Sequence, residues 1–360
     1  MIKVAMIVRK TLYTVPGGDT VQVTETARSL RKMDVEADIL LTTEKVVYEK
    51  YTLLHFFNLI RPADILFHAK KSGKPYVIST ILVDYSEYDQ QHRGGIVGLL
   101  CKMFSPDTIE YCKTIVRRIS GKDALVSPEY IWLGHKRSVE KVLRGASLLL
   151  PNSASEYKRL MYRYQCAAAC LVVPNAIDPE LFKPGSRSEE DKELVLCAAR
   201  IEGLKNQANL IKALSGTAYR LVIAGASAPN HVSYAAHCRK IAGENVVFLG
   251  QIEPHELLWY YARAKVHVLP SWFETTGLSS LEAAAMGCNI VVTRKGDTEE
   301  YFGEDAWYCD PDSPASILDA IRAASKSPNN GRLQKKILES YTWQKAAEAT
   351  LHAYQKVLTT

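Results

Sequence analysis

The chain has 360 residues, of which 47% are hydrophobic and 23% charged, and its formal net charge is +6. This composition is typical of a globular protein and excludes a disordered chain, a collagen-like fibre and a disulfide-rich miniprotein. All apolar runs are shorter than the roughly 20 residues that span a bilayer, so we expect no transmembrane helix.

Strand-like and helix-like runs alternate in the first half of the chain. The N-terminal MIKVAMIV predicts a first strand and not a signal peptide. The expected strands cover 2–8, 35–42, 76–83 and 146–152, and helices fit 20–33 and 62–73. Residues 84–145 interrupt this alternation because they contain no convincing strand. A connection of that length predicts a functional insertion with helices of its own.

The same alternation returns in the second half. The expected strands cover 170–175, 194–199, 219–225, 246–250, 266–270 and 289–293. The helices that fit between and after them cover 206–214, 234–242, 254–264, 278–287, 314–325 and 343–357. Near-continuous β-branched runs predict strands that are buried on both faces of a parallel sheet.

Two rounds of strand–helix alternation predict an α/β protein with two doubly wound, Rossmann-like domains. We place the first domain at 1–168, with a helical insertion at 85–145, and the second at 169–342. The eight cysteines include no C-x-x-C pair, which predicts reduced core thiols in a cytoplasmic protein.

The positive charge is concentrated in the first half. Residues 1–170 have a net charge of +8 and residues 171–360 a net charge of −2, with most of the excess in 91–170. Such asymmetry is typical of a protein with an anionic partner, such as a membrane surface, a phosphorylated lipid or a nucleic acid, although a solvated basic face explains it equally well. We expect no nucleic-acid partner, because no module that binds one is recognisable.

Two loops that follow expected strands carry groups suited to phosphates, since open parallel sheets bind ligands beyond the carboxyl ends of their strands. Gly17 and Gly18 precede a helix and would let backbone N–H groups approach a ligand closely, although a plain turn is an equal alternative. Arg200 and Lys205 follow the strand at 194–199 and could clamp a diphosphate; the alternative is an exposed loop with ordinary charges.

The stretch after the strand at 266–270 is the most informative. Glu274 lies in the loop, Gly277 near the expected helix start, and Glu282 about one turn into the helix. Free N–H groups at a helix start suit phosphate oxygens, and carboxylates accept from the vicinal hydroxyls of a sugar or ribose. The arrangement fits a nucleotide-diphosphate sugar, while acids that only complement the helix dipole are the alternative.

These residues resemble the retaining family 4 of GT-B glycosyltransferases, the glycosyl transferases of group 1 type. Its E-x7-E signature stands as Glu274-TTGLSSL-Glu282, followed by AAAMG. Supporting segments are 246–252, 266–274 and 174–182, together with the positions of Arg200, Lys205, Gly17 and Gly18. The resemblance implies a GT-B fold, in which two Rossmann-like domains face each other across a cleft, with a last helix at 343–360 that crosses back to the first domain.

The resemblance also implies roles for the residues around the donor sugar. Glu274 would bind the sugar hydroxyls, and Glu282 would hold the ribose. Backbone N–H groups of Thr276, Gly277 and Leu278 would bind the sugar and the phosphates.

Further implied roles concern the phosphates and the base. Arg200 and Lys205 would stabilise the charge on the leaving diphosphate, which is the main electrostatic demand of the reaction. Gly17 and Gly18 would cover the phosphates from the first domain, and Ile252 would lie near the base.

One departure concerns the acceptor side. Many relatives carry a histidine near the end of the fourth strand of the first domain, whereas this chain has Asp84 there. Asp84 could orient or deprotonate the acceptor hydroxyl, and a capping aspartate is an equal alternative. The string Asp310-Pro311-Asp312 reads as a loop, and the usual chemistry of the fold implies no metal or other cofactor.

We therefore predict a cytoplasmic retaining glycosyltransferase that moves a sugar from a UDP- or GDP-sugar to a glycan or lipid-linked acceptor in polysaccharide or lipopolysaccharide assembly. The alternatives are a non-catalytic nucleotide-sugar-binding subunit and a GT-B nucleotide-sugar epimerase. The apolar segment 96–104 could contact the inner face of the membrane as part of a peripheral surface, or form a buried helix. The basic residues that would assist it are Arg93, Lys102, Lys113, Arg117 and Arg118.

Overall fold

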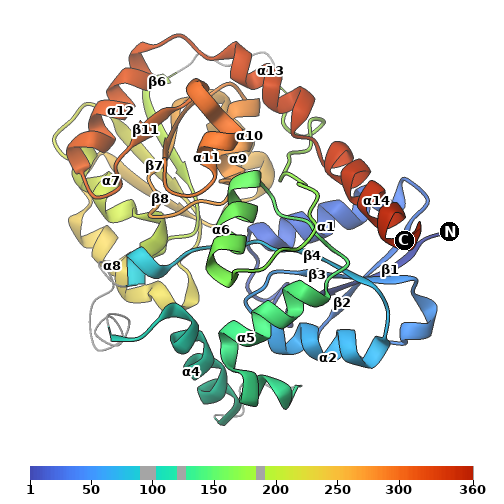
Figure 1. Ribbon diagram of the computed structural model, residues 1–360. Coiled ribbons are helices and arrows are strands. Elements are labelled where there is room, and N and C mark those ends of the chain that lie inside the picture. The colour runs from blue at the N-terminus through green and yellow to red at the C-terminus, as the bar shows by residue number, and fades with distance from the viewer. Residues whose placement is uncertain (90–102, 120–126, 184–190, 360) are drawn as a thin grey trace. The chain divides into compact units, whose positions relative to one another are not determined.

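The computed structural model describes residues 1–89, 103–119, 127–183 and 191–359, and the chain divides into two compact units. Unit 1 comprises 1–82, 89–175 and 343–360. Unit 2 comprises 83–88 and 176–342. Each unit contains its own parallel sheet with helices packed against it (Figure 1).

The sheet of unit 1 has five strands in the order β2-β1-β3-β4-β5, and all their pairings are parallel. The strands are β1 (Lys3–Val8), β2 (Glu36–Leu41), β3 (Leu53–Phe57), β4 (Tyr76–Ser79) and β5 (Leu148–Leu149). Their central members are buried along nearly their whole length, which explains why apolar residues run through them without alternation.

Helices cover both faces of this sheet: α14 packs on α1, and α2 packs on α5 (Figure 1). The helices of unit 1 are α1 (Gly18–Arg31), α2 (Pro62–Ser72), α4 (Pro106–Ile119), α5 (Glu129–Gly145), α6 (Ala154–Tyr164) and α14 (Trp343–Thr359), with the 3-10 turn η1 (Tyr48–Lys50). The described part of 84–145 thus contains α4 and α5 and no strand.

The sheet of unit 2 has six parallel strands in the order β11-β10-β9-β6-β7-β8. They are β6 (Asp191–Ala198), β7 (Arg220–Ala224), β8 (Val246–Gly250), β9 (Ala264–Leu269), β10 (Asn289–Thr293) and β11 (Trp307–Cys309). The strands β9 and β10 are buried at every position and form the middle of one large apolar core.

Strand and helix alternate through unit 2, as a doubly wound fold requires. Its helices are α7 (Gln207–Leu214), α8 (Val232–Ile241), α9 (Pro254–Arg263), α10 (Leu278–Ala285), α11 (Thr298–Phe302), α12 (Pro314–Lys326) and α13 (Gly331–Ser340). Its 3-10 turns are η3 (Gly203–Lys205), η4 (Pro229–His231) and η5 (Gly303–Asp305). Among the described helices none has the length and hydropathy needed to cross a bilayer.

The prediction of two parallel Rossmann-like sheets is confirmed, but individual strands differ. The strand β3 was not predicted, because His55 interrupts its apolar run. The strand expected at 170–175 does not form; only Cys170 makes an isolated bridge, to Leu149. The strand expected at 76–83 ends at Ser79, and Ile81 then adopts a left-handed φ of 46°.

His55 is accommodated in the core because both of its ring nitrogens have partners. Nδ1 lies 2.7 Å from the Tyr354 hydroxyl of α14, and Nε2 lies 2.9 Å from the Ser79 hydroxyl of β4. Burial lowers the pKa of His55 to about 3, so the ring is neutral. The last helix is therefore tied to the sheet of unit 1 by a buried polar contact.

We expect Tyr354→Phe to lower the free energy of unfolding by about 1–3 kcal/mol, because it leaves a buried ring nitrogen of His55 without a partner. Urea denaturation measures the change. The matched control is Tyr162→Phe, since Tyr162 is 88% exposed and its substitution should have little effect. Equal stability of the two variants would contradict the assigned contact.

Candidate functional site

Unit 2 brings Lys205 and Glu274 together at the carboxyl end of its sheet. The strands β6 and β9 are neighbours, so the loops that follow them leave the sheet side by side. Lys205 Nζ forms an ion pair with Glu274 Oε1, and the Ser271 hydroxyl donates to the same oxygen at 2.7 Å. Glu274 is only 4% exposed, so its charge is compensated inside the protein.

The backbone of Glu274 is held by the loop that follows β10. Its N–H donates to the Lys295 carbonyl at 3.0 Å, and its carbonyl accepts from the Asp297 N–H at 2.8 Å. Between them Gly296 has a φ of 113°, and a Cβ at this position would overlap the Glu274 carbonyl oxygen. Glycine at 296 is therefore required for this close approach of the two loops.

Arg200 lies in the same loop as Lys205, directly after β6. Its side chain is 40% exposed, and its nearest acidic contact is a loose one of 3.6 Å to Glu202. Its backbone carbonyl accepts from the Gln207 side chain at 2.9 Å, which fixes the main chain below it. The backbone of Arg200 is thus fixed, while its guanidinium group remains accessible to solvent.

The residues between the two glutamates form the start of α10. Gly277 is the N-cap, with a left-handed φ of 71°, and Leu278 is the first helical residue. Thr276 is buried. This turn places the positive end of the α10 dipole directly after Glu274, a suitable position for an anionic ligand.

Glu282 differs from Glu274 in its surroundings. It lies on α10, partly buried, and its Oε2 accepts a hydrogen bond of 2.9 Å from the Tyr261 hydroxyl of α9. Burial raises the pKa of Glu282 to about 7, and the Tyr261 hydrogen bond only partly offsets this. One glutamate of the E-x7-E pair is therefore locked in an ion pair, while the other titrates near neutral pH.

The raised pKa of Glu282 predicts a pH-dependent stability. Between about pH 4.5 and pH 7 the folded protein keeps a proton that the unfolded chain has released, so the free energy of unfolding falls as the pH rises. We expect Glu282→Gln to reduce this fall by about 1–3 kcal/mol.

Urea unfolding at the two ends of that pH range measures the effect. Glu339→Gln is the control. Glu339 is exposed on α13, and its contact with Lys335 is a loose one of 3.9 Å. An unchanged pH dependence in Glu282→Gln would show that this carboxyl titrates normally.

Two further predicted site residues, Ile252 and Asp84, belong to unit 2 but are not part of the Lys205–Glu274 ion pair. Ile252 follows β8, two strands away from β6, and packs partly buried against the core. Asp84 lies in the 83–88 segment of unit 2, and its Oδ1 accepts from the Ser86 N–H at 2.9 Å. Asp84 therefore makes the kind of backbone contact that its alternative role, a capping aspartate, requires.

Gly17 and Gly18 belong to unit 1, at the start of α1. Gly17 is the N-cap, and its N–H donates to the Thr20 hydroxyl at 3.0 Å. The Asp19 carboxylate accepts from the Thr20 N–H at 3.0 Å and forms an ion pair with Arg9 at 2.6 Å. The phosphate-covering role that we expected of Gly17 and Gly18 stays a prediction.

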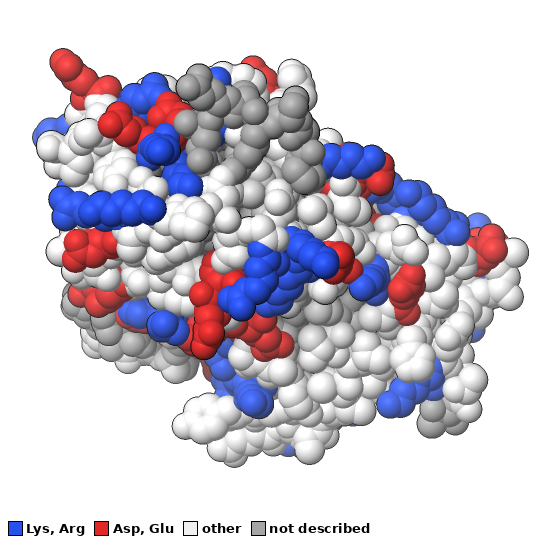
Figure 2. Space-filling view, turned by 90° about the horizontal axis from the view of Figure 1, so that it is seen from above, with Lys and Arg blue, Asp and Glu red and all other residues white. Residues whose placement is uncertain are grey.

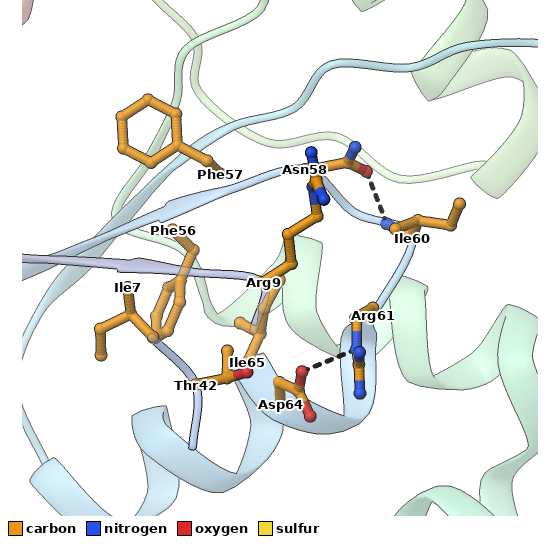
Figure 3. A pocket seen from close by; sticks show the side chains of 10 residues that line it. All are labelled: Ile7, Arg9, Thr42, Phe56, Phe57, Asn58, Ile60, Arg61, Asp64 and Ile65. Atoms are coloured by element: carbon orange, nitrogen blue, oxygen red, sulfur yellow. Dashed lines mark hydrogen bonds and ion pairs between the residues drawn. The ribbon is translucent and has the colours of Figure 1, made fainter. Parts of the chain in front are cut away.

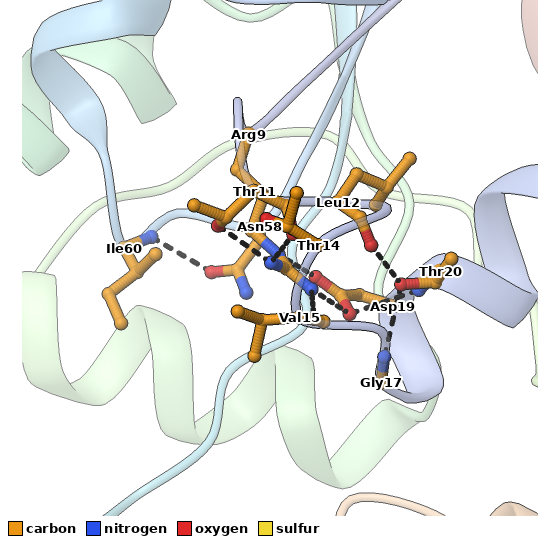
Figure 4. A network of polar contacts seen from close by, with 10 residues as sticks. All are labelled: Arg9, Thr11, Leu12, Thr14, Val15, Gly17, Asp19, Thr20, Asn58 and Ile60. Carbon is orange, nitrogen blue, oxygen red and sulfur yellow. Dashed lines mark hydrogen bonds and ion pairs between the residues drawn. The ribbon is translucent and has the colours of Figure 1, made fainter. Parts of the chain in front are cut away.

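Arg9, which the sequence pattern did not single out, closes this loop. Figure 4 shows its guanidinium group at the centre of the loop, where it donates to both oxygens of Asp19 at 2.6 and 3.0 Å. It also donates to the carbonyls of Thr11 and Val15, each at 2.8 Å. These bonds use the guanidinium donors within the protein, so we assign Arg9 a structural role.

A small pocket lies beside Arg9 at the carboxyl ends of β1 and β3 (Figure 3). Arg61 and Asp64 form an ion pair of 2.9 Å on its wall, and Phe56 and Ile7 supply apolar surface. Its volume of about 20 Å³ is room for a water molecule and not for a sugar.

The string Asp310-Pro311-Asp312 forms a turn after β11. The Asp312 N–H donates to Asp310 Oδ1 at 3.1 Å, and the Pro311 carbonyl accepts from the side chains of Asn206 and Asn209. Within the described ranges no three His, Cys, Asp or Glu side chains gather as metal ligands.

Residues 178–340, nearly all of the longer part of unit 2, match the family model described as glycosyl transferases group 1. The chain is 26% identical to the D-inositol 3-phosphate glycosyltransferase 1 of Catenulispora acidiphila, over 95% of this chain and 91% of that protein. It is 24% identical to the MMP alpha-(1->4)-mannosyltransferase of Mycolicibacterium hassiacum, over 63% of this chain. That match and the match to a Paenarthrobacter aurescens relative span only 58% and 60% of those proteins.

Solved structures share the fold along the whole chain. Sucrose-phosphate synthase from Thermosynechococcus elongatus has a TM-score of 0.73 at 16% identity, and the match covers 100% of both chains. Anabaena HepE in complex with UDP-glucose has a TM-score of 0.71 at 14% identity, with 99% of this chain and 100% of that chain covered. The predicted GT-B fold is confirmed by these likenesses.

Proposed function

From the match of residues 178–340 to the family model of the group 1 glycosyl transferases, we propose that the chain transfers a sugar from a UDP- or GDP-sugar to a glycan or lipid-linked acceptor, with retention at the anomeric carbon. The observation that carries the proposal is the buried Lys205–Glu274 pair, with Arg200 and the start of α10 at the same sheet edge. The complexes of HepE with UDP and UDP-glucose support a donor of this class. Assembly of a polysaccharide or lipopolysaccharide is the setting we propose.

The positive groups of the site suit a leaving diphosphate. Breaking the bond between sugar and phosphate places negative charge on the phosphate oxygens, and preorganised cations stabilise that charge in the transition state. Lys205 has three N–H donors, of which Glu274 takes one, so the others can reach phosphate oxygens. Arg200 supplies a second cation whose tip is accessible.

The carboxylates suit the hydroxyl groups of the donor. Glu274 Oε1 is already bonded to Lys205 and Ser271, and Oε2 is the oxygen we assign to the sugar hydroxyls. Glu282, in its ionised form, would accept from the vicinal hydroxyls of the ribose. Thr276, Gly277 and Leu278 would present backbone N–H groups to the sugar and phosphates, and Ile252 would pack beside the base.

Asp84 remains our candidate for orienting the acceptor hydroxyl. Its bond to the Ser86 N–H fixes the carboxylate, and an ionised carboxylate keeps further lone pairs for a hydroxyl donor. Attack on the same face as the departing phosphate would retain the anomeric configuration. The proposed chemistry uses no metal or other cofactor.

The direct test is turnover by the purified full-length chain with a panel of UDP- and GDP-sugars. We expect Lys205→Ala and Glu274→Gln each to lower kcat by about 100-fold or more, as removal of one charge-stabilising group does elsewhere. Lys212→Ala is the matched control, because Lys212 is exposed on the neighbouring helix α7 and should leave kcat unchanged.

Three outcomes distinguish the alternatives. Full activity in both site variants would contradict the site. Binding of nucleotide sugars without turnover would favour a non-catalytic binding subunit. Conversion of the donor to its epimer, seen by NMR, would identify an epimerase.

A membrane contact through unit 1 is a second part of the proposal. The described residues of 103–132 expose large apolar side chains, among them Ile119 at 81% and Trp132 at 87%. Arg117 is exposed on α4, two residues before Ile119, and Lys113 pairs with Glu110 on the same helix. Most of segment 96–104, with Arg93 and Lys102, lies outside the described residues, and so does the side chain of Arg118.

The face of the molecule drawn in Figure 2 does not gather its charge in one place. Figure 2 shows Lys and Arg interspersed with Asp and Glu over the face that it presents. We therefore propose that any attraction of this face to anionic lipid comes from a local cluster and not from the net charge of +6.

We expect sedimentation with vesicles that contain anionic lipid to recover the protein at low salt, and Arg117→Glu combined with Trp132→Ser to weaken the recovery several-fold. Arg322→Glu combined with Trp259→Ser is the control, because both residues are exposed on unit 2. Recovery that does not depend on anionic lipid would contradict the contact.

A further inference from the structure

Residues 83–88 are the part of unit 2 that lies farthest from the rest in sequence, since the remainder begins at 176. Val83 and Tyr88 pack against three apolar side chains of the site loops, Leu204, Trp272 and Phe273. Leu204 directly precedes Lys205, and Phe273 directly precedes Glu274. The segment therefore contacts both loops that carry the ion pair, at the residues next to it.

In the contact with the Lys205 loop, the Tyr88 side chain packs directly against the backbone of Gly203. The Tyr88 hydroxyl and ring lie where a side chain of Gly203 would be, so a Cβ at 203 would overlap them. Gly203 begins η3, which ends at Lys205. The two loops also meet directly, because the Trp272 N–H donates to the Leu204 carbonyl at 2.9 Å. Tyr88 thus rests against the turn that presents Lys205.

The contact with the second loop is made through Lys295. Its ammonium group forms an ion pair with Glu87 and lies 5.3 Å from the centroid of the Trp272 ring. The carbonyl of the same residue accepts the Glu274 N–H at 3.0 Å. Lys295 therefore connects Glu87, through its side chain, to Glu274, through its backbone.

We propose that Glu87 and Tyr88 are positioning residues, which hold the Lys205 loop and the Glu274 loop in the geometry that the donor requires. This inference rests on the proposed function of the Lys205–Glu274 pair. Neither residue touches the donor; each acts through a neighbour, Tyr88 through Gly203 and Glu87 through Lys295. Displacement of a reacting group by about 1 Å can reduce a rate by about 100-fold, so loop position is itself a determinant of turnover.

The test exchanges the charges of the Glu87–Lys295 pair. We expect Glu87→Lys and Lys295→Glu each to lower kcat at least about tenfold with a smaller change in the KM for the donor, and the double variant to recover most of the loss. Glu299→Lys is the matched control, because Glu299 pairs with the adjacent Arg294 at an exposed site. Tyr88→Ala should lower kcat, and Tyr88→Phe should retain most of it.

Hydrogen exchange of the full-length protein supplies a measurement that does not depend on activity. Both single charge variants and Tyr88→Ala should exchange faster at 200–206 and 271–277, and the double charge variant should return toward the wild-type rate. Unchanged exchange in these loops, or a double variant as impaired as the single variants, would overturn the proposal. If the wild-type chain turns over no nucleotide sugar, the proposed function fails, and the exchange rates still decide whether the segment holds the loops.

Discussion

The buried charge of Glu274 is the constraint on which the site depends. A carboxylate this enclosed is costly unless a cation and hydrogen-bond donors compensate it. Lys205 and Ser271 do so from two loops, which can meet because β6 and β9 are adjacent parallel strands. The loop after β10 then fixes the backbone of Glu274, at a distance that only Gly296 permits. The pairing of Lys205 with Glu274 therefore depends on the strand order of the sheet and on the contact between the loops that follow β9 and β10.

Much of the fold could be predicted because buried parallel strands leave a strong local pattern. The strands β8 and β10 have the predicted bounds, since each contains an uninterrupted apolar run, at 246–249 and at 290–292. The strand β3 was missed because His55 looks polar in sequence, whereas its two partners come from β4 and α14. A local pattern cannot show that a polar residue will find buried partners 24 and 299 residues away.

The candidate site shows the same division. Lys205 and Glu274 could be chosen from spacing and resemblance, because each follows a strand end that the pattern reveals. The residues that support them could not be chosen in this way: Lys295 and the 83–88 segment act through contacts between distant parts of the chain. The pKa of Glu282 depends likewise on Tyr261 and on packing, and not on the E-x7-E spacing.

The return of α14 to unit 1 has a consequence for the order of events on the ribosome. All of unit 2, including 83–88, has been synthesised once residue 342 is made, whereas unit 1 still lacks the helix that packs on α1 and satisfies His55. Domains generally fold as units during synthesis, those made first before those made later. Unit 1 therefore contains the first strands to be synthesised and is still the unit that is completed last. Until α14 packs on it, His55 Nδ1 lacks its hydrogen-bond partner, the Tyr354 hydroxyl.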